Sequence, residues 1–236
     1  VPYTASGFAA CGKLFSSLFG ADYMTAMIIS AIVIVGYTAA GGFLAASTTD
    51  FIQSIIMTIA IIFVMVFATV SAGGIGAVME NARELPGYLS ATSTYVAKSG
   101  EAAPYGFLKI VSTCAWGFGY FGMPHILLRF MAIKDENKLK LSRRVASVWV
   151  VIAMAMAVFI GMVGNALSKQ GIIATLIESD TETVIVRIAD LLSKYGIIPA
   201  LIAGLILAGI LASTMSTADS QLLAASSSVS QNVLQD

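Results

Sequence analysis

Residues that could form a binding site interrupt one otherwise apolar stretch of the sequence. The segment 112–130 reads STCAWGFGYFGMPHILLRF, in which three glycines precede Pro124 within eight residues. Glycine weakens a helix, and proline removes a backbone donor and clashes with the preceding turn. Backbone groups freed at membrane depth need protein or a water-filled cavity to cover them, and interrupted helices point to transporter binding sites. The pattern predicts a helix broken at 116–124, although the same residues could merely ease helix packing.

Three side chains flank this break: Trp116, Tyr120 and His125. His125 is the only histidine of the chain. It could relay a proton, or it could fill a hydrogen-bonded packing position. With one histidine and no Ser-His-Asp set, the sequence offers little acid–base chemistry, so we do not expect an enzyme.

Hydroxyl side chains form a stripe along another apolar segment, ILASTMSTADSQLLAASSSVSQN. Ser213, Ser216, Thr217 and Ser220 follow the helical spacing i, i+3, i+4 and i+7, and Asp219 borders them. Polar groups are costly inside a membrane unless they have a partner. Serine and threonine often join helices, but hydroxyls beside a carboxylate also suit a hard cation with oxygen ligands. Sodium is the natural candidate for such a site.

A second acid, Asp50, lies in the apolar sequence GGFLAASTTDFIQ. It could be an N-cap or first-turn acid of a helix, which the helix dipole favours. Alternatively, it lies at a membrane depth similar to that of the hydroxyl stripe. In that case Asp50 and the stripe could share one ion.

The elements that position these residues follow from the scarcity of charge. The chain has 236 residues, 58% hydrophobic and 11% charged, with thirteen basic against thirteen acidic residues and a mean hydropathy of +0.88. That composition leaves too little polar surface for a soluble enzyme and no basic excess for a nucleic-acid binder. It is also too apolar for a disordered chain. We therefore expect an all-α polytopic membrane protein.

Long charge-free stretches locate the membrane spans. Five stretches of 19 to 29 residues contain no charged residue, and about 20 apolar residues cross the hydrocarbon core as a helix. None shows the alternation that is typical of barrel strands. The sequence predicts a partial helix and then five spanning helices: 1–18, 22–40, 48–74, 106–132, 145–167 and 198–226. Because the chain begins inside an apparent helix and ends just after another, we expect it to be a piece of a larger protein.

The loops indicate which side of the membrane each end of a span faces. The loop 134–144, KDENKLKLSRR, carries five Lys or Arg residues and is expected in the cytoplasm. Loops 77–103 and 169–196 are then extracellular. The second should contain a short amphipathic helix, lying at the interface or acting as an outer lid, because apolar residues recur at helical spacing: Val184, Ile185, Ile188, Leu191 and Leu192.

Three motifs resemble those of a known transporter family. They read GYTAAGGFLAASTTDFIQSIIM, GYFGMPHILLRFMA with a tryptophan before it, and ILASTMSTADSQLL. Together they resemble the sodium/solute symporter family, and most of all its bacterial sodium/proline branch, over nearly the whole chain. The resemblance implies part of a leucine-transporter-type inverted-repeat fold. The partial helix would match core helix 3, and the five spanning helices would match core helices 4 to 8, with the broken one as helix 6.

The resemblance also implies roles for residues of the stripe. The main sodium site of the family would fall here on a carbonyl and two hydroxyls of core helix 8: Ser213, Ser216 and Thr217. A second sodium site or release path would involve Ser216 again, together with Asp50, Asp219 and Ser220. Partner groups for both sites would lie on core helix 1, which this sequence does not include.

Substrate and gate positions are implied by the same resemblance. The family's aromatic and proline positions on helix 6 match Trp116, Tyr120 and Pro124, and we group them with His125. Met123 departs from the pattern, because proline carriers tend to have glutamine just before that proline. The identity of the solute is therefore open.

The function implied by the resemblance is secondary active transport. We expect sodium-coupled symport of a small organic solute, proline or another amino acid, by alternating access in the plasma membrane, here the bacterial inner membrane. Alternatives are a sodium-coupled carrier of another solute such as a small organic acid, an ion channel, or a structural membrane subunit. A channel should show pore-lining charges or a carbonyl filter, and a structural subunit needs no broken helix beside an acidic hydroxyl stripe. The expected partners are the solute, sodium and the lipid bilayer, without nucleic acid; sodium stoichiometry and oligomeric state stay undetermined.

Overall fold

The computed structural model describes residues 2–176 and 178–232, most of which are helical. Helices are expected of a chain in an apolar medium, because they satisfy their own backbone hydrogen bonds. The chain forms two compact units. One comprises Val1–Ile61, Pro124–Leu139 and Ser193–Asp236, and the other comprises Ile62–Met123 and Lys140–Leu192.

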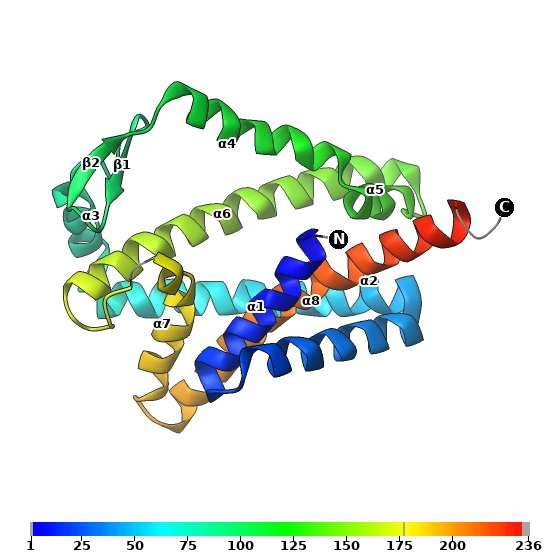
Figure 1. Cartoon of the computed structure of the whole chain (residues 1–236), viewed down its shortest axis with the longest axis horizontal. Coiled ribbons are helices and arrows are strands. Elements are labelled where there is room, and N and C mark those ends of the chain that lie inside the picture. Colours follow the sequence, from blue (N-terminus) through cyan, green and yellow to red (C-terminus); the bar gives the residue numbers. More distant parts are fainter. Residues whose placement is uncertain (1, 177, 233–236) are drawn as a thin grey trace. The chain divides into compact units, whose positions relative to one another are not determined.

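Helices make up most of the first unit. Three are long, namely α1 (Pro2–Phe19), α2 (Tyr23–Ser71) as far as residue 61, and α8 (Ile197–Asn232), and α5 (Pro124–Met131) is short. Helix α1 packs along α8 (Figure 1), and Thr4 Oγ1 donates to Gln221 Oε1 over 2.6 Å. The buried core joins one residue from each of α1, α2 and α8: Cys11, Ile34 and Ala218.

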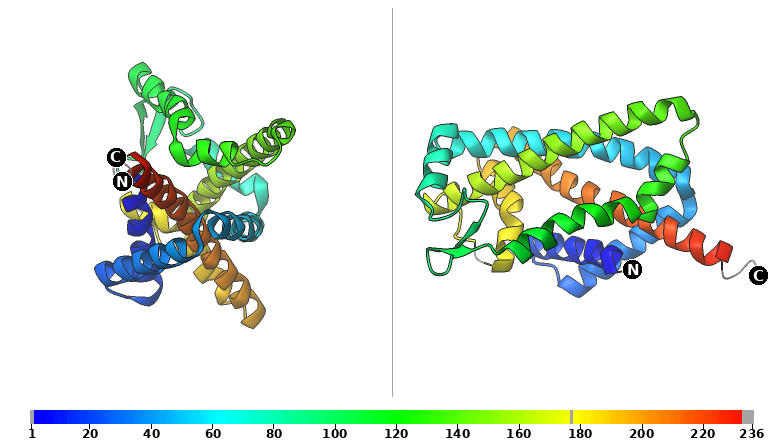
Figure 2. Two further views of the ribbon diagram at one scale, coloured as in Figure 1. Left: turned by 90° about the vertical axis from the view of Figure 1, so that its right-hand side faces the viewer. Right: turned by 90° about the horizontal axis from the view of Figure 1, so that it is seen from above.

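Helix α2 reverses its direction at one residue, Gly42, as Figures 1 and 2 show. Gly42 has φ 60° and ψ −157°, a backbone conformation that glycine adopts without a Cβ clash. The turn expected between residues 40 and 48 is thus reduced to a single glycine. A straight helix of 49 residues would be about 74 Å long, against about 30 Å for the hydrocarbon core. The reversal therefore divides α2 into two arms, 23–41 and 43–71, each long enough to cross a membrane.

The length and composition of the helices indicate a membrane protein. In the described part of the chain, three helices are long and apolar enough to span: Tyr23–Ser71, Glu136–Lys169 and Ile197–Asn232. Large apolar side chains on them are widely exposed, for example Ile32 at 66%, Phe51 at 68% and Leu201 at 70%. Soluble monomers rarely expose so large an apolar surface, whereas a lipid bilayer would cover it.

The glycine-rich segment forms an interrupted helix. Helix α4 (Phe107–Gly119) gives way to a 3-10 turn, η1 (Tyr120–Gly122), and the helix resumes as α5 at Pro124. Between them Met123 is extended, with φ −73° and ψ 114°, because a following proline disfavours the helical conformation. The break lies within the predicted range 116–124, and the boundary between the two units falls at the same place.

The second unit contains structure where the sequence predicted only a loop. Most of the predicted loop 77–103 is structured. It contains all but the first residues of α3 (Gly74–Glu84). It also contains an antiparallel pair of strands, β1 (Ser93–Val96) and β2 (Glu101–Pro104), except for the last residue of β2. The strands pair from Ser93–Pro104 to Val96–Glu101 and turn at Gly100, whose φ is 71°. Four-residue strands are too short for alternation to reveal them in a sequence.

Polar contacts join the C-terminal end of α6 (Leu139–Lys169) to α3 and to Ala72, which lies shortly before α3. Asn81 Nδ2 donates to Asn165 Oδ1 over 2.9 Å, and Gln170 Nε2 donates to the carbonyl of Ala72 over 3.0 Å. Lys169 pairs with Glu84, and both side chains are about half exposed. These contacts fix α3 against the end of α6.

The amphipathic helix predicted in segment 169–196 is present as α7 (Val184–Ser193), after a 3-10 stretch, η3 (Glu178–Thr183). Its buried side chains are Val186, Ile188, Ala189 and Leu192. The buried face therefore includes Val186 and Ala189, which the sequence analysis did not assign to the apolar side. Val184 approaches α6 so closely that a Cβ on Gly164 would lie 2.3 Å from Val184 Cγ2.

Candidate functional site

The candidate site begins with the close packing of α8 on the second arm of α2. A Cβ on Gly209 of α8 would lie 2.8 Å from Ala60 Cβ. Small residues at such a contact let two helix backbones approach closely, as in many membrane helix pairs. Further along α8 and further back along α2, Ser220 Oγ lies 3.4 Å from Asp50 Oδ2. The two contacts show that α8 and the second arm of α2 run antiparallel to each other.

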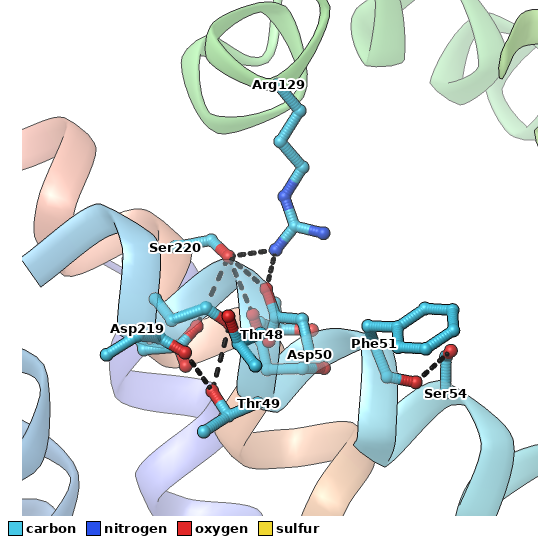
Figure 3. A network of polar contacts seen from close by, with 12 residues as sticks. Thr48, Thr49, Asp50, Phe51, Ser54, Arg129, Asp219 and Ser220 are labelled. Carbon is cyan, nitrogen blue, oxygen red and sulfur yellow. Dashed lines mark hydrogen bonds and ion pairs between the residues drawn. The ribbon is translucent and has the colours of Figure 1, made fainter. Parts of the chain in front are cut away.

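A cluster of polar residues is buried at the second of these contacts. Asp50, Asp219 and Ser220 are only 7%, 0% and 8% exposed. Arg129 reaches from α5 and donates through Nη2 to both Asp50 Oδ2 and Ser220 Oγ, as Figure 3 shows. On the first arm of α2, Tyr37 Oη donates to Asp219 Oδ2 over 3.0 Å. One arginine thus faces two acids in apolar surroundings.

The hydroxyl of Ser220 cannot satisfy all of its neighbours. Its single proton has three acceptors within reach: the carbonyl of Ser216 at 2.8 Å, Asp219 Oδ1 at 3.2 Å and Asp50 Oδ2 at 3.4 Å. The carbonyl of Ser216 is the nearest acceptor, so Ser220 contributes little to the carboxylates. Asp50 Oδ1 is buried and accepts no hydrogen bond from the described residues. Buried carboxylate oxygens usually have a partner, so this atom has capacity to bind a cation.

The capping role considered for Asp50 does not match the helix. The second arm of α2 begins after Gly42, so Asp50 lies beyond its first two turns and is neither an N-cap nor a first-turn residue. Asp22 is the capping acid of α2, since its Oδ2 accepts from Thr25 N at 2.9 Å and from Thr25 Oγ1 at 2.8 Å. The bonds from Thr25 hold the pKa of Asp22 below its ordinary value.

The three residues expected to form the main sodium site lie together on α8. Ser216 Oγ and Thr217 Oγ1 both donate to the carbonyl of Ser213, each over 3.2 Å. Ser213 is exposed, and Ser216 and Thr217 are half-buried. Their oxygens form a compact group of a carbonyl and two hydroxyls, which are ligand types suited to a hard cation. Within the described residues, no group of three or more His, Cys, Asp or Glu residues could hold a metal ion.

The residues expected at the substrate or gate position are divided between the two units. Trp116 of α4 and Tyr120 of η1 are 60% and 52% exposed in the second unit. Met123 is the half-buried extended residue of the break, and Pro124 is the exposed first residue of α5. His125 lines a small pocket of the first unit with Asp50, Arg129 and Ser220. Within the first unit, His125 is thus the member of this set that lies beside the acidic cluster.

Two members of the cluster are absent from the sequence-based list of site residues. In the sequence, Arg129 and Tyr37 stand out only as members of the family motifs GYFGMPHILLRFMA and GYTAAGGFLAASTTDFIQSIIM. The signal that could have found Arg129 is the need of an intramembrane acid for a cationic partner. The sequence analysis places Asp50 and Ser220 in one candidate site, but nothing in the sequence indicates that Arg129 joins them, because that contact depends on how three helices pack.

Comparison with known proteins shows which family this chain is similar to. A model of the sodium:solute symporter family matches residues 1–235. Among curated relatives, sodium/proline symporter 2 of Staphylococcus saprophyticus is 38% identical over 230 residues, and osmoregulated proline transporter OpuE of Bacillus subtilis is 36% identical over 231. The sodium/proline symporter of Staphylococcus aureus is 38% identical over 230.

Each of these alignments covers 98% of this chain but only 42%, 44% and 41%, respectively, of the relative. The chain thus spans less than half the length of the curated relatives it matches. No solved structure matches the chain.

Proposed function

We propose that this chain, which belongs to the sodium:solute symporter family, acts in sodium-coupled symport of a small organic solute. Proline is the first candidate solute, because two of the relatives described above are named sodium/proline symporters and the third is named a proline transporter. The activity is transport rather than catalysis. The protein would lie in the plasma membrane of a bacterium and cross it several times.

The observation that carries this proposal is the buried acid and hydroxyl cluster on α2 and α8. Two carboxylates in apolar helices are expensive unless they serve a purpose, and Asp50 Oδ1 accepts no hydrogen bond within the described chain. We assign the second sodium site or release path to Asp50, Asp219 and Ser220. The main site is assigned to the Ser213 carbonyl with the Ser216 and Thr217 hydroxyls.

The interrupted helix supports a solute site in the same chain. The α-helical pattern is interrupted between α4 and α5, where a 3-10 turn is followed by the extended Met123. Half-helix ends and unwound backbone line the sites of inverted-repeat transporters. We assign the chain to part of a leucine-transporter-type inverted-repeat fold. In that arrangement Trp116, Tyr120, Met123, Pro124 and His125 contact the solute or control its exit during alternating access.

The energy available from one sodium ion is sufficient for accumulation of a solute. One positive charge moving down 100 mV supplies about 2.3 kcal/mol, and a tenfold sodium gradient adds about 1.4 kcal/mol. Their sum corresponds to a concentration ratio of roughly 500 for a neutral solute. Tight coupling to one ion could therefore sustain uptake of a nutrient present at low concentration.

Sodium-driven uptake by the full-length protein in vesicles tests the proposal. Labelled proline, other amino acids and small organic acids would be compared with sodium and with potassium outside. We expect Ser216→Ala and Thr217→Ala to raise the sodium concentration needed for half-maximal uptake. Ser226→Ala is the matched control, because Ser226 Oγ makes the same kind of bond to its own helix, to the Leu223 carbonyl at 3.1 Å. Uptake that needs no sodium would contradict the proposal.

Counterflow separates a carrier from a channel. Vesicles loaded with sodium and unlabelled solute should transiently accumulate labelled solute if a carrier exchanges one molecule for another. A channel would only equilibrate the label. For Asp50→Asn we expect impaired sodium coupling or release, and unchanged uptake with unchanged sodium affinity would exclude Asp50 from the ion path.

A further inference from the structure

The position of Arg129 suggests a role beyond pairing with an acid. Its Nη2 donates at once to Asp50 Oδ2 and Ser220 Oγ, and both oxygens belong to residues assigned above to the second sodium site. A guanidinium and a sodium ion both carry one positive charge. A cation bound by these two oxygens would have to take the place of that nitrogen, so Arg129 and sodium cannot both be bound there.

Arg129 and Asp50 differ strongly in their exposure to solvent. The Arg129 side chain is 48% exposed, whereas that of Asp50 is 8% exposed. The arginine is therefore not enclosed by the cluster, and its long flexible stem lets the charged end move away from the acids. The buried carboxylate cannot follow it, and Asp219 beside it is fully buried. After Arg129 leaves, the two acids need another cation.

Arg129 also belongs to a segment that the break separates from α4. Helix α5 is only eight residues long and follows the 3-10 turn and the extended Met123. Helix α5 packs on α8, and Arg129 adds a direct bond to the second arm of α2. Release of Arg129 would remove the bond between α5 and α2.

We propose that Arg129 is a tethered cation that occupies the Asp50–Ser220 site when sodium is absent and is displaced when sodium binds there. The exchange keeps the local charge constant, and it couples ion occupancy to the attachment of the segment that follows the break. The inference rests on the proposed sodium site at Asp50. It assigns Arg129 as a residue that sets sodium affinity and coupling.

The test measures sodium binding without requiring a known solute. Thermal unfolding of the purified full-length protein would be followed as sodium chloride replaces potassium chloride at constant ionic strength. Loss of the competing cation in Arg129→Gln should lower the sodium concentration for half-maximal stabilisation about tenfold, the scale of a bond to a charged group. Arg129→Lys should give a smaller change, and Arg143→Gln on α6 should match the wild type. A merely structural role would lower the unfolding temperature without tightening sodium binding.

The double variant Asp50→Asn/Arg129→Gln identifies the site of competition. It should respond to sodium as Asp50→Asn alone does, because Arg129 has nothing to compete for once the carboxylate is removed. A second outcome is that the wild type responds to sodium while Arg129→Gln needs the same or a higher sodium concentration for half-maximal stabilisation. That result overturns the role of Arg129 as a tethered cation but leaves the proposed sodium site standing. A wild type with no response to sodium overturns the proposed sodium site and the tether with it.

A labelling experiment covers the case in which Arg129→Gln does not fold. Ser47 lines the small pocket beside Asp50 and Arg129, and Ser47→Cys is nearly isosteric. The other reactive thiols of the protein are removed and Arg129 is kept. Sodium should then accelerate modification of this cysteine severalfold as Arg129 leaves. A rate that is equal in sodium and potassium would contradict the displacement.

Discussion

The contact between Gly209 and Ala60 should control both stability and ion binding. In Gly209→Ala the new Cβ would lie 2.8 Å from Ala60 Cβ, whereas carbon atoms in contact prefer about 3.5–4.0 Å. Helices α8 and α2 would have to separate by about 1 Å, and we expect a loss of about 1–3 kcal/mol in unfolding free energy from overpacking. The 3.4 Å approach of Ser220 to Asp50 would lengthen at the same time, so sodium affinity should fall.

Two further variants separate this steric effect from the general effect of alanine. Gly204 is on the same helix, and a Cβ there would meet nothing within 4 Å. Gly204→Ala should therefore be neutral or stabilise by up to about 1 kcal/mol through helix propensity. Adding Ala60→Gly to Gly209→Ala should restore the space and recover stability. Unfolding in denaturant and sodium titration of the full-length protein give both readouts, and equal effects of Gly204→Ala and Gly209→Ala would refute the reasoning.

Three smaller predictions concern single contacts, each measured by equilibrium unfolding of the full-length protein. Tyr37→Phe removes the donor to Asp219 Oδ2 and should cost about 1–3 kcal/mol, because a buried carboxylate loses a partner; an unchanged midpoint would mean that this bond is not formed. Gly42→Ala forces an L side chain to φ 60° and ψ −157°, a region essentially restricted to glycine, and should cost about 1–3 kcal/mol. Gly36→Ala, where a Cβ meets nothing, should not destabilise, and equal losses in the two variants would argue against the reversal at Gly42. Lys169→Ala breaks an ion pair whose side chains are both half exposed and should change stability by less than about 1 kcal/mol; a larger loss would show that the pair is not solvated.

Features that depend on local sequence could be predicted. The break at residues 120–123 follows from three glycines and a proline, each of which acts on its own turn of helix. Helix α7 follows from the spacing of apolar residues in segment 169–196. The hydroxyl stripe follows from the helical period alone, and the structure has Ser213, Ser216 and Thr217 on one helix with their oxygens together.

Features that depend on tertiary packing could not be predicted. The cluster requires Asp50, Arg129 and Ser220 to meet from three helices, and no local pattern specifies which of the thirteen basic residues will reach the acid. The predicted spans 22–40 and 48–74 imply a reversal between them, but as a loop of several residues. Only the φ of 60° at Gly42 shows that a single glycine is enough.

The acidic cluster and the small-residue contact form a single arrangement. Asp50 and Asp219 can be buried only where a donor or cation reaches them, and Ser220 reaches Asp50 because α8 lies close against α2. That closeness is set at Gly209, further along α8, where a side chain would force the helices apart. A change that affects only packing should therefore appear as a change in ion binding, whereas removal of Arg129 should alter ion binding while leaving the contact at Gly209 intact. The two kinds of variant thus distinguish the frame of the site from the group that competes for it.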